Sequence, residues 1–263
     1  METMIESSRT IEVATVLHPI EIPSPDRKTI LDVRHLRVDF RGHQSITALD
    51  GIDLTIGEGE ILGLVGESGS GKTVLALSLL RLVANPGRIT DGAILWNGRN
   101  LLEIDDNAIQ QVRGREMAMI FQNPLASLNP VRTVRAQFMA LLRLHHNLTN
   151  SEAEKEAVRL LREVGIPDPE RIMGNYPFQL SGGLCQRVMV AMAISCRPKL
   201  LIADEPTASL DVTIQAQIME LLLTLRDRMG MAILLVSHDL GVIARLCDRV
   251  AVMYLGRIVE VAE

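Results

Sequence analysis

One run of small residues has the composition and spacing of a phosphate-binding loop. Its eight residues fit the pattern G-x-x-x-x-G-K-[ST]: Gly66, Glu67, Ser68, Gly69, Ser70, Gly71, Lys72 and Thr73. Glycines let consecutive backbone N–H groups converge on phosphate oxygens, and the lysine reaches the terminal phosphates of a nucleotide. The threonine hydroxyl suits Mg²⁺ beside those phosphates. A chance Gly/Ser loop is the alternative, which the strand pattern before it and the helix pattern after it disfavour.

Two adjacent carboxylates, Asp204 and Glu205, follow the apolar run 200–203. An acid at the end of a strand, in a chain that carries a phosphate loop, suits Mg²⁺ binding by Asp204. Glu205 is placed one residue further on, where it would polarise an attacking water. Without the loop, the pair would fit equally well as a charged strand end that caps the next helix.

Two further polar residues follow apolar runs of strand length. Gln122 comes after residues 117–121, and His238 comes shortly after residues 234–236. A lone histidine is more often structural than functional. Its position after the strand that carries Asp204 favours a role in the same site.

The segment 180–187 joins two glycines to a helical run. It reads Leu180, Ser181, Gly182, Gly183, Leu184, Cys185, Gln186 and Arg187. The serine hydroxyl and the N-terminus of the following helix could both bind a phosphate oxygen. Taken locally, the segment fits an ordinary N-cap with a glycine turn just as well.

Composition sets the broad class of the protein. The chain has 263 residues, of which 47% are apolar and only 3% aromatic, so we expect one large domain with an aliphatic core. The net charge of −5 argues against nucleic acid as the main partner. The three cysteines lack metal-ligand spacing and are expected to be buried or half-buried thiols. No apolar run is long enough to cross a bilayer and no secretory signal is visible, so we expect a soluble cytoplasmic protein.

The pattern along the chain predicts an α/β fold with a mainly parallel sheet. Residues 1–30 contain three prolines without periodicity and are expected to form a flexible arm. Alternation predicts an N-terminal β region at 31–40 and 46–56. Short apolar runs predict buried strands, and helical patterns lie between several of them. These runs are 61–65, 117–121, 200–203, 232–236 and 250–253.

The middle of the chain is expected to be a helical subdomain inserted in the sheet domain. Residues from about 131 to 192 contain no convincing strand. Within them, Ser151 and Glu154 have the spacing of a capping box, with Ser151 as N-cap. The helix that follows is expected to end at Gly165 and Pro167.

Together, the phosphate loop, Asp204–Glu205 and the Leu180–Arg187 segment resemble the motifs of ABC-type ATPases, in family order from about residue 31 to the end. The resemblance implies ATP and Mg²⁺ as ligands, with Thr73, Gln122 and Asp204 near the metal. It implies catalysis by Glu205 with a switch histidine, His238, and a glutamine, Gln122, that senses the γ-phosphate. Ser181 and its neighbours would contact the nucleotide of a second subunit. Asp211 would bridge the two subunits.

Adenine recognition in this family usually involves an aromatic residue from an early strand. Phe40 is the best candidate in this chain. Plain core packing of Phe40 is the open alternative.

The loop after Gln122 points to one branch of the family. Residues 121–130, FQNPLASLNP, are similar to a run in the ATPases of bacterial oligopeptide, dipeptide and nickel importers. Asn123 departs from the usual acidic residue, and Leu184-Cys185 occupies positions more often filled by Met, Gln or Arg. This branch usually carries a C-terminal extension, which we expect to be absent because the chain stops at Glu263.

The resemblance also implies the partners and the location. They are a second ATPase subunit, in a homodimer or a heterodimer, two membrane-spanning permease subunits and, indirectly, an extracytoplasmic solute-binding protein. The chain would lie on the cytoplasmic face of the bacterial inner membrane. A soluble switch ATPase without transport and a nucleotide-binding scaffold without hydrolysis are the competing hypotheses. The motifs do not distinguish peptides from nickel or another small solute.

Overall fold

The computed structural model describes residues 27–42, 45–208 and 210–263. Most of the expected flexible arm therefore lies outside the described residues. The expected end of that arm is wrong by two residues, because a strand already begins at Thr29. The side chain of Arg27, just before it, donates to Asp248 across 2.9 Å.

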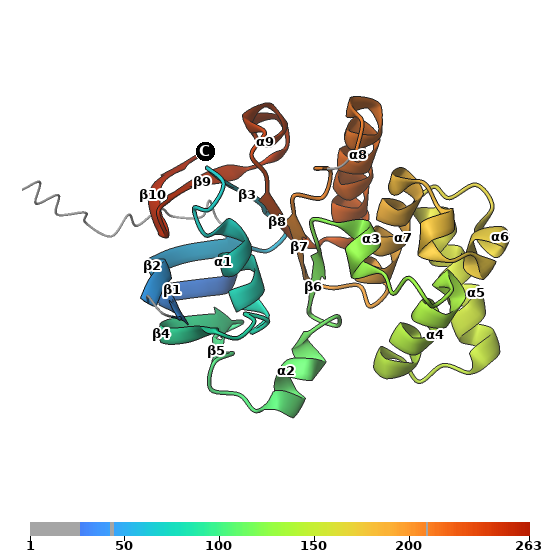
Figure 1. Cartoon of the computed structure of the whole chain (residues 1–263), viewed down its shortest axis with the longest axis horizontal. Helices are drawn as coiled ribbons and strands as arrows, with labels where there is room; N and C mark the ends of the chain where they lie inside the picture. Colours follow the sequence, from blue (N-terminus) through green and yellow to red (C-terminus); the bar gives the residue numbers. More distant parts are fainter. Residues whose placement is uncertain (1–26, 43–44, 209) are drawn as a thin grey trace, which may run out of the picture.

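Two sheets form the larger part of the molecule (Figure 1). An antiparallel sheet has the strand order β2-β1-β4-β5, and a six-stranded sheet has the order β10-β9-β3-β8-β7-β6. The antiparallel strands are β1 (Thr29–Arg41), β2 (Ser45–Gly57), β4 (Gly87–Trp96) and β5 (Arg99–Asn100). The strands of the second sheet are β3 (Ile61–Gly66), β6 (Met117–Ile120), β7 (Leu200–Asp204), β8 (Ala232–Val236), β9 (Arg249–Tyr254) and β10 (Arg257–Ala262).

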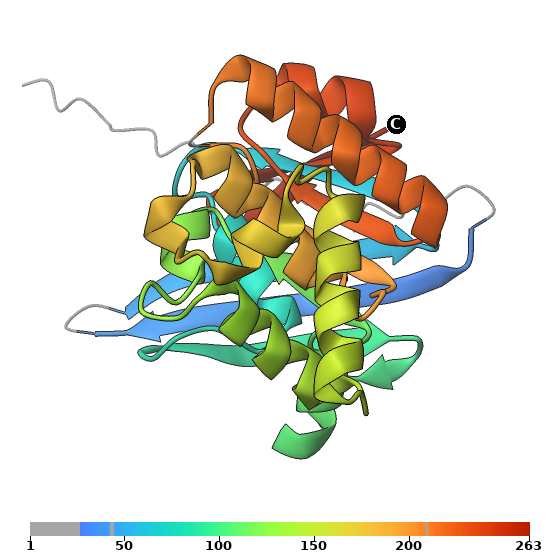
Figure 2. The same ribbon diagram turned by 90° about the vertical axis from the view of Figure 1, so that its right-hand side faces the viewer.

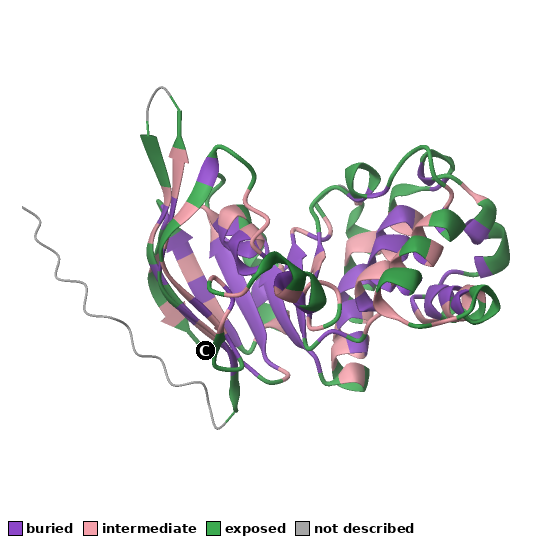
Figure 3. Cartoon of the chain, turned by 90° about the horizontal axis from the view of Figure 1, so that it is seen from below, coloured by how far each residue is buried: buried purple, intermediate pink, exposed green. Residues whose placement is uncertain are grey.

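The six-stranded sheet is parallel except at its edge, where β10 pairs antiparallel with β9. This arrangement confirms the predicted α/β fold with a mainly parallel sheet and an antiparallel N-terminal β region. The central strands β7 and β8 are buried on both faces, which explains their continuous apolar sequences. Figure 3 shows this burial as the purple centre of the molecule.

Alternation along the buried strands divides the core into two clusters. Leu200 and Ile202 pack into the cluster beneath the antiparallel sheet and helix α1 (Lys72–Leu79). Leu201 and Ala203 point the other way, into a cluster shared with the helices on the opposite face. Because successive side chains of a strand point to opposite faces, each strand ties the two halves of the core together.

The chain between β6 and β7 is helical, and no strand is described between residues 121 and 199. Figures 1 and 2 show the helices α4 to α7 gathered on the side away from the antiparallel sheet. The helices of this segment are α3 (Pro124–Ser127), α4 (Val134–His145), α5 (Asn150–Glu163), α6 (Pro169–Gly174), the 3₁₀ turn η1 (Pro177–Gln179) and α7 (Gly182–Ile194). The remaining helices are α2 (Asp106–Val112), α8 (Val212–Met229) and α9 (Leu240–Leu246).

The predicted start of α5 is wrong by two residues. Thr149, not Ser151, is the N-cap, and its partner in the capping box is Glu152. The Glu152 carboxylate accepts from the Thr149 backbone N–H at 2.8 Å, which satisfies a donor that the helix itself leaves unpaired. Glu154 instead forms an ion pair with Arg135 of α4, with 2.5 Å between nitrogen and oxygen.

The burial of the cysteines and the character of the helices bear on two further expectations from composition. Cys185 is buried and the other two cysteines are half-buried, as predicted. Within the described part of the chain, no helix combines the length and the apolar character needed to cross a membrane.

Candidate active site

The phosphate loop connects the end of β3 to the first turn of α1. Two of its glycines, Gly66 and Gly71, are required by space as well as by backbone conformation. A Cβ on Gly71, where φ is +106°, would lie 2.7 Å from the Ala48 carbonyl oxygen. A Cβ on Gly66 would collide with the Met253 carbonyl oxygen. The loop can therefore follow its path only without side chains at these two positions.

Lys72 is buried, and its ammonium group lies inside the loop. It donates to the carbonyl oxygens of Gly66 at 2.7 Å and Glu67 at 2.8 Å. These contacts hold the positive charge at the N-terminus of α1, where the helix dipole also favours an anion. The arrangement suits a group of phosphate oxygens placed over the loop.

Asp204 ends strand β7 with a carboxylate that is only 2% exposed. Burial raises the pKa of this carboxyl above its ordinary value, while a hydrogen bond from the Thr73 hydroxyl acts in the opposite direction. Among the described residues, its Oδ1 atom has no hydrogen-bond partner. An unpartnered buried carboxylate oxygen beside a hydroxyl is a pair of hard oxygen ligands, so the residues fit Mg²⁺.

The Glu205 carboxylate is held by two side chains from different strand ends. The Gln122 amide Nε2 donates to its Oε2 at 2.7 Å, and His238 Nδ1 lies 3.4 Å from its Oε1. Glu205 also adopts a φ of +44°, with its N–H donating to the Val236 carbonyl at 3.0 Å. The carboxyl ends of parallel strands thus bring together three residues that lie far apart in the sequence.

A cavity of about 250 Å³ joins the loop to these catalytic candidates. Its lining includes seven of the predicted site residues together with two residues that the sequence did not suggest, Ala48 and Val74. The lining residues are Ala48, Ser68, Gly69, Gly71, Lys72, Thr73, Val74, Gln122 and Glu205. Val74 simply follows the motif, whereas Ala48 comes from β2 and carries no signal in its local sequence.

The Leu180–Arg187 segment lies apart from this cavity, and none of its residues lines it. Ser181 is exposed and is the N-cap of α7, accepting from the Leu184 N–H at 3.4 Å. Gly182 beside it is also exposed, and α7 belongs to the helical side of the molecule in Figure 1. Gln186 differs from these neighbours because it is 1% exposed, so its side chain faces the core.

Two further predicted residues have clear structural surroundings. Asp211 is exposed and caps α8, accepting from the Ile214 N–H at 3.0 Å. Phe40 packs against Gly87, where an added Cβ would lie 2.7 Å from its ring, and against the core beneath the antiparallel sheet. Phe40 does not line the cavity, so these contacts agree with the core-packing alternative and leave adenine stacking a prediction.

Comparison with known proteins assigns this arrangement to a family. Residues 49–208 match the family described as "ABC transporter". The chain is 51% identical over 241 residues to a probable peptide ABC transporter ATP-binding protein of Sinorhizobium fredii, covering 91% of this chain and 72% of that protein. It is 49% identical over 232 residues to the dipeptide transport ATP-binding protein DppD of Haemophilus influenzae, covering 88% of this chain and 70% of that protein.

Solved structures show the same fold. The ATP-binding cassette MJ0796, in a dimeric post-hydrolysis state bound to ADP and Pi, superposes with a TM-score of 0.79 at 28% identity. The match covers 89% of this chain and 98% of that one. With the family match, the relatives and the phosphate loop beside Glu205 in agreement, the chain belongs to the ABC transporter family of ATP-binding proteins and is an ATPase.

Proposed function

We propose that the chain is the ATP-hydrolysing subunit of a bacterial peptide importer. The observation that carries the proposal is the Glu205 carboxylate, held between Gln122 and His238 at the rim of a cavity that contains Lys72. A scaffold without hydrolysis would not need this base. The names of the relatives favour transport over a soluble switch, and they favour peptides as the solute.

The chemistry follows from the contacts of the side chains. Lys72 and the loop N–H groups bind the phosphates of ATP, and Glu205 orients the water that attacks the γ-phosphate. Gln122 and His238 fix the carboxylate and close the site on that side. Thr73 and Asp204, with Gln122 as a further candidate ligand, would hold Mg²⁺, and the bound ion would neutralise charge on the phosphates.

A second ATPase subunit completes each site. Ser181 and the exposed N-terminus of α7 offer a hydroxyl and backbone N–H groups to an anion, but they lie apart from the cavity of their own chain. The dimeric state of the similar cassette MJ0796 supports an arrangement in which each Ser181 faces the nucleotide of the other subunit. Leu180, Gly182 and Gly183 shape this segment, and Asp211 at the start of α8 would lie near the subunit boundary.

The membrane partners would dock beside Gln122. Three apolar side chains are exposed close to Gln122 in the sequence: Phe121 directly before it, and Leu125 and Val131 after it, at 38%, 48% and 80%. A cluster of exposed apolar groups indicates a protein contact. Two permease subunits docked there would hold the chain at the cytoplasmic face of the membrane, with a solute-binding protein on the other side. In this organisation the nucleotide-binding domain begins with β1 at Thr29 rather than at residue 31, and residues from about 131 to 192 form its helical subdomain.

Reconstitution tests the proposal. The chain would be assembled in liposomes with the permease subunits, the partner ATPase and the solute-binding protein encoded beside it. We expect ATP hydrolysis to rise when the binding protein is loaded with a peptide. Hydrolysis that responds to a metal ion instead, or that never responds to the binding protein, would contradict a peptide importer.

A further inference from the structure

The turn between β9 and β10 lies directly against the phosphate loop, although nearly 190 residues separate them in the sequence. The Gly256 N–H donates to the Ser70 carbonyl oxygen at 2.9 Å. On its other side, the Gly256 carbonyl accepts from the Asp50 N–H of β2, also at 2.9 Å. One residue of the turn thus connects the phosphate loop to the antiparallel sheet.

The packing around this turn leaves no free space. Gly256 has a φ of +79°, and a Cβ there would lie 2.7 Å from the Ala48 carbonyl. The same carbonyl limits Gly71, and the Met253 carbonyl limits Gly66. Because loop, turn and β2 are in contact through backbone atoms, a shift of the turn displaces the loop rather than being absorbed by side chains.

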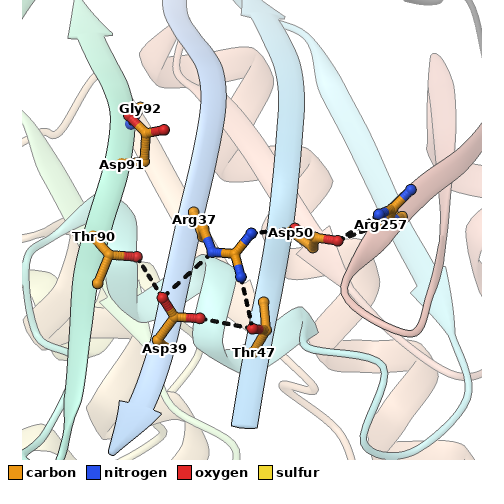
Figure 4. A network of polar contacts seen from close by, with 8 residues as sticks. All are labelled: Arg37, Asp39, Thr47, Asp50, Thr90, Asp91, Gly92 and Arg257. Carbon is orange, nitrogen blue, oxygen red and sulfur yellow. Dashed lines mark hydrogen bonds and ion pairs between the residues drawn. The ribbon is translucent and has the colours of Figure 1, made fainter. Parts of the chain in front are cut away.

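An ion-pair network fixes the turn from its outer side (Figure 4). Arg257 donates through Nε and Nη2 to Asp50 Oδ2, at 3.0 and 2.5 Å. Arg37 of β1 donates to the second oxygen of Asp50 at 2.9 Å. Through Asp39, which accepts from Thr47 at 2.7 Å and Thr90 at 2.8 Å, the network extends across β2, β1 and β4.

We propose that Arg257 and Asp50 are positioning residues that set the phosphate loop against β2 and thereby tune the affinity for nucleotide. Neither residue lines the cavity. They act through Gly256, which contacts Ser70 of the loop, and through β2, whose Ala48 does line the cavity. The inference rests on the proposed nucleotide site at the phosphate loop.

A merely structural ion pair would behave differently. Exposed pairs contribute little to stability, and losing one leaves the properties of a folded site unchanged. The Arg34–Asp32 pair provides a matched control. It lies on β1 with 2.6 Å between nitrogen and oxygen, and the side-chain hydrogen bonds described for Arg34 go to Asp32 rather than to the β9–β10 turn.

The test is the dissociation constant of ATP for the full chain, measured by calorimetry in the presence of Mg²⁺ well below the unfolding temperature. For Arg257→Ala and for Asp50→Asn we expect about fivefold weaker binding, which corresponds to ~1 kcal/mol. The double variant should bind no more weakly than Asp50→Asn alone, because Asp50→Asn already disrupts the ion pair that Arg257→Ala removes, together with the one to Arg37. Arg257→Lys should recover part of the affinity, and Arg34→Ala should bind as the unchanged chain does.

Two results would overturn the inference. One is unchanged affinity in both Arg257→Ala and Asp50→Asn while each remains folded by circular dichroism. The other is an equal loss in Arg34→Ala, which would indicate a general loss of stability. Lys72→Ala tests the nucleotide site independently of Arg257. If the phosphate loop binds ATP, this variant loses ATP binding. If it binds ATP normally, the proposed nucleotide site is wrong rather than the role of Arg257.

Discussion

At the residue scale, the site depends on a backbone conformation that glutamate rarely adopts. The φ of +44° at Glu205 lies in the left-handed region, which costs a non-glycine residue about 1–2 kcal/mol. Its N–H bond to Val236 and the side-chain contacts from Gln122 and His238 offset this cost. The strained turn directs the carboxylate along the rim of the cavity, beside the phosphate loop.

Replacing the proposed base is the most direct prediction at this scale. Glu205→Gln keeps the size and hydrogen-bonding capacity of the side chain but removes its basicity. We expect ATP binding to be retained and turnover in the assembled complex to fall by about 10²–10⁴-fold. Steady-state phosphate release measures the effect.

Glu58→Gln is the control for that prediction, since Glu58 is an exposed surface residue whose carboxylate pairs with Lys28 in the described part of the chain. It should leave turnover unchanged. Normal phosphate release from Glu205→Gln would show that another group activates the water.

At the element scale, the start of α5 shows how local chemistry selects a helix boundary. Thr149–Glu152 and Ser151–Glu154 are both sequences that could form a capping box. The structure uses the first pair, which leaves Glu154 free to bond Arg135 and fixes α5 to α4. Docking of α5 against α4 therefore gives Glu154 an ion-pair partner, and Glu152 remains to complete the capping box.

This assignment predicts different effects for two similar substitutions. Thr149→Ala should lower the free energy of unfolding by about 1 kcal/mol, the usual value of an N-cap hydroxyl. Ser151→Ala should change it by less than about 0.5 kcal/mol, because Ser151 is an exposed residue of the first turn. Urea unfolding of the two variants measures both values, and equal losses would contradict the assignment.

The cap also carries a pH dependence with a definite sign. Hydrogen bonds from the Thr149 side chain and backbone lower the pKa of Glu152 below its ordinary value. Because the pKa of Glu152 is lower in the folded chain than in the unfolded chain, its carboxylate stabilises the fold at pH values above its pKa in the unfolded chain. This stabilisation is lost as the pH falls through its pKa in the folded chain. The free energy of unfolding of Thr149→Ala should therefore differ less from that of the unchanged chain in acid than at neutral pH.

At the scale of the whole molecule, the phosphate loop and the proposed second phosphate contact, Ser181, belong to different parts of the chain. The loop lies on the sheet side, and Ser181 lies at the start of α7 on the helical side (Figure 1). Ser181 does not line the cavity of its own chain in this arrangement. Closure of two chains around ATP is the simplest way to unite them.

That division predicts a variant that separates binding from dimerisation. In a Glu205→Gln background, Ser181→Arg should bind ATP normally, because Ser181 does not line the cavity. It should abolish the ATP-dependent dimer, alone or with the partner ATPase, since a long cation would occupy the space of the second chain's phosphate. Light scattering after size exclusion measures the mass.

Ser151→Arg adds the same charge at another exposed helix start and serves as the control. It should leave the dimer intact. An ATP-dependent dimer that survives Ser181→Arg would refute the proposed role of Ser181 in the opposite site.

Much of the architecture follows from local sequence alone. Three features could be predicted because each depends on contacts within a few residues. They are the glycines and Lys72 of the loop, the apolar strand before Asp204, and the helical middle of the chain. Strand periodicity was sufficient to predict the parallel sheet, since burial on both faces requires continuous apolar runs. Where two local solutions were nearly equal, as at Ser151 and Thr149, the sequence could not choose between them.

Other features were decided only by the tertiary structure. The core-facing position of Gln186, the packing of Phe40 on Gly87 and the contact of Gly256 with Ser70 all depend on neighbours distant in the sequence. The sequence by itself determined which residues could bind phosphate and hydrolyse ATP. The folded chain determined how they are grouped, because strand order and helix docking bring Gln122, Glu205 and His238 to one sheet edge and direct Ser181 elsewhere.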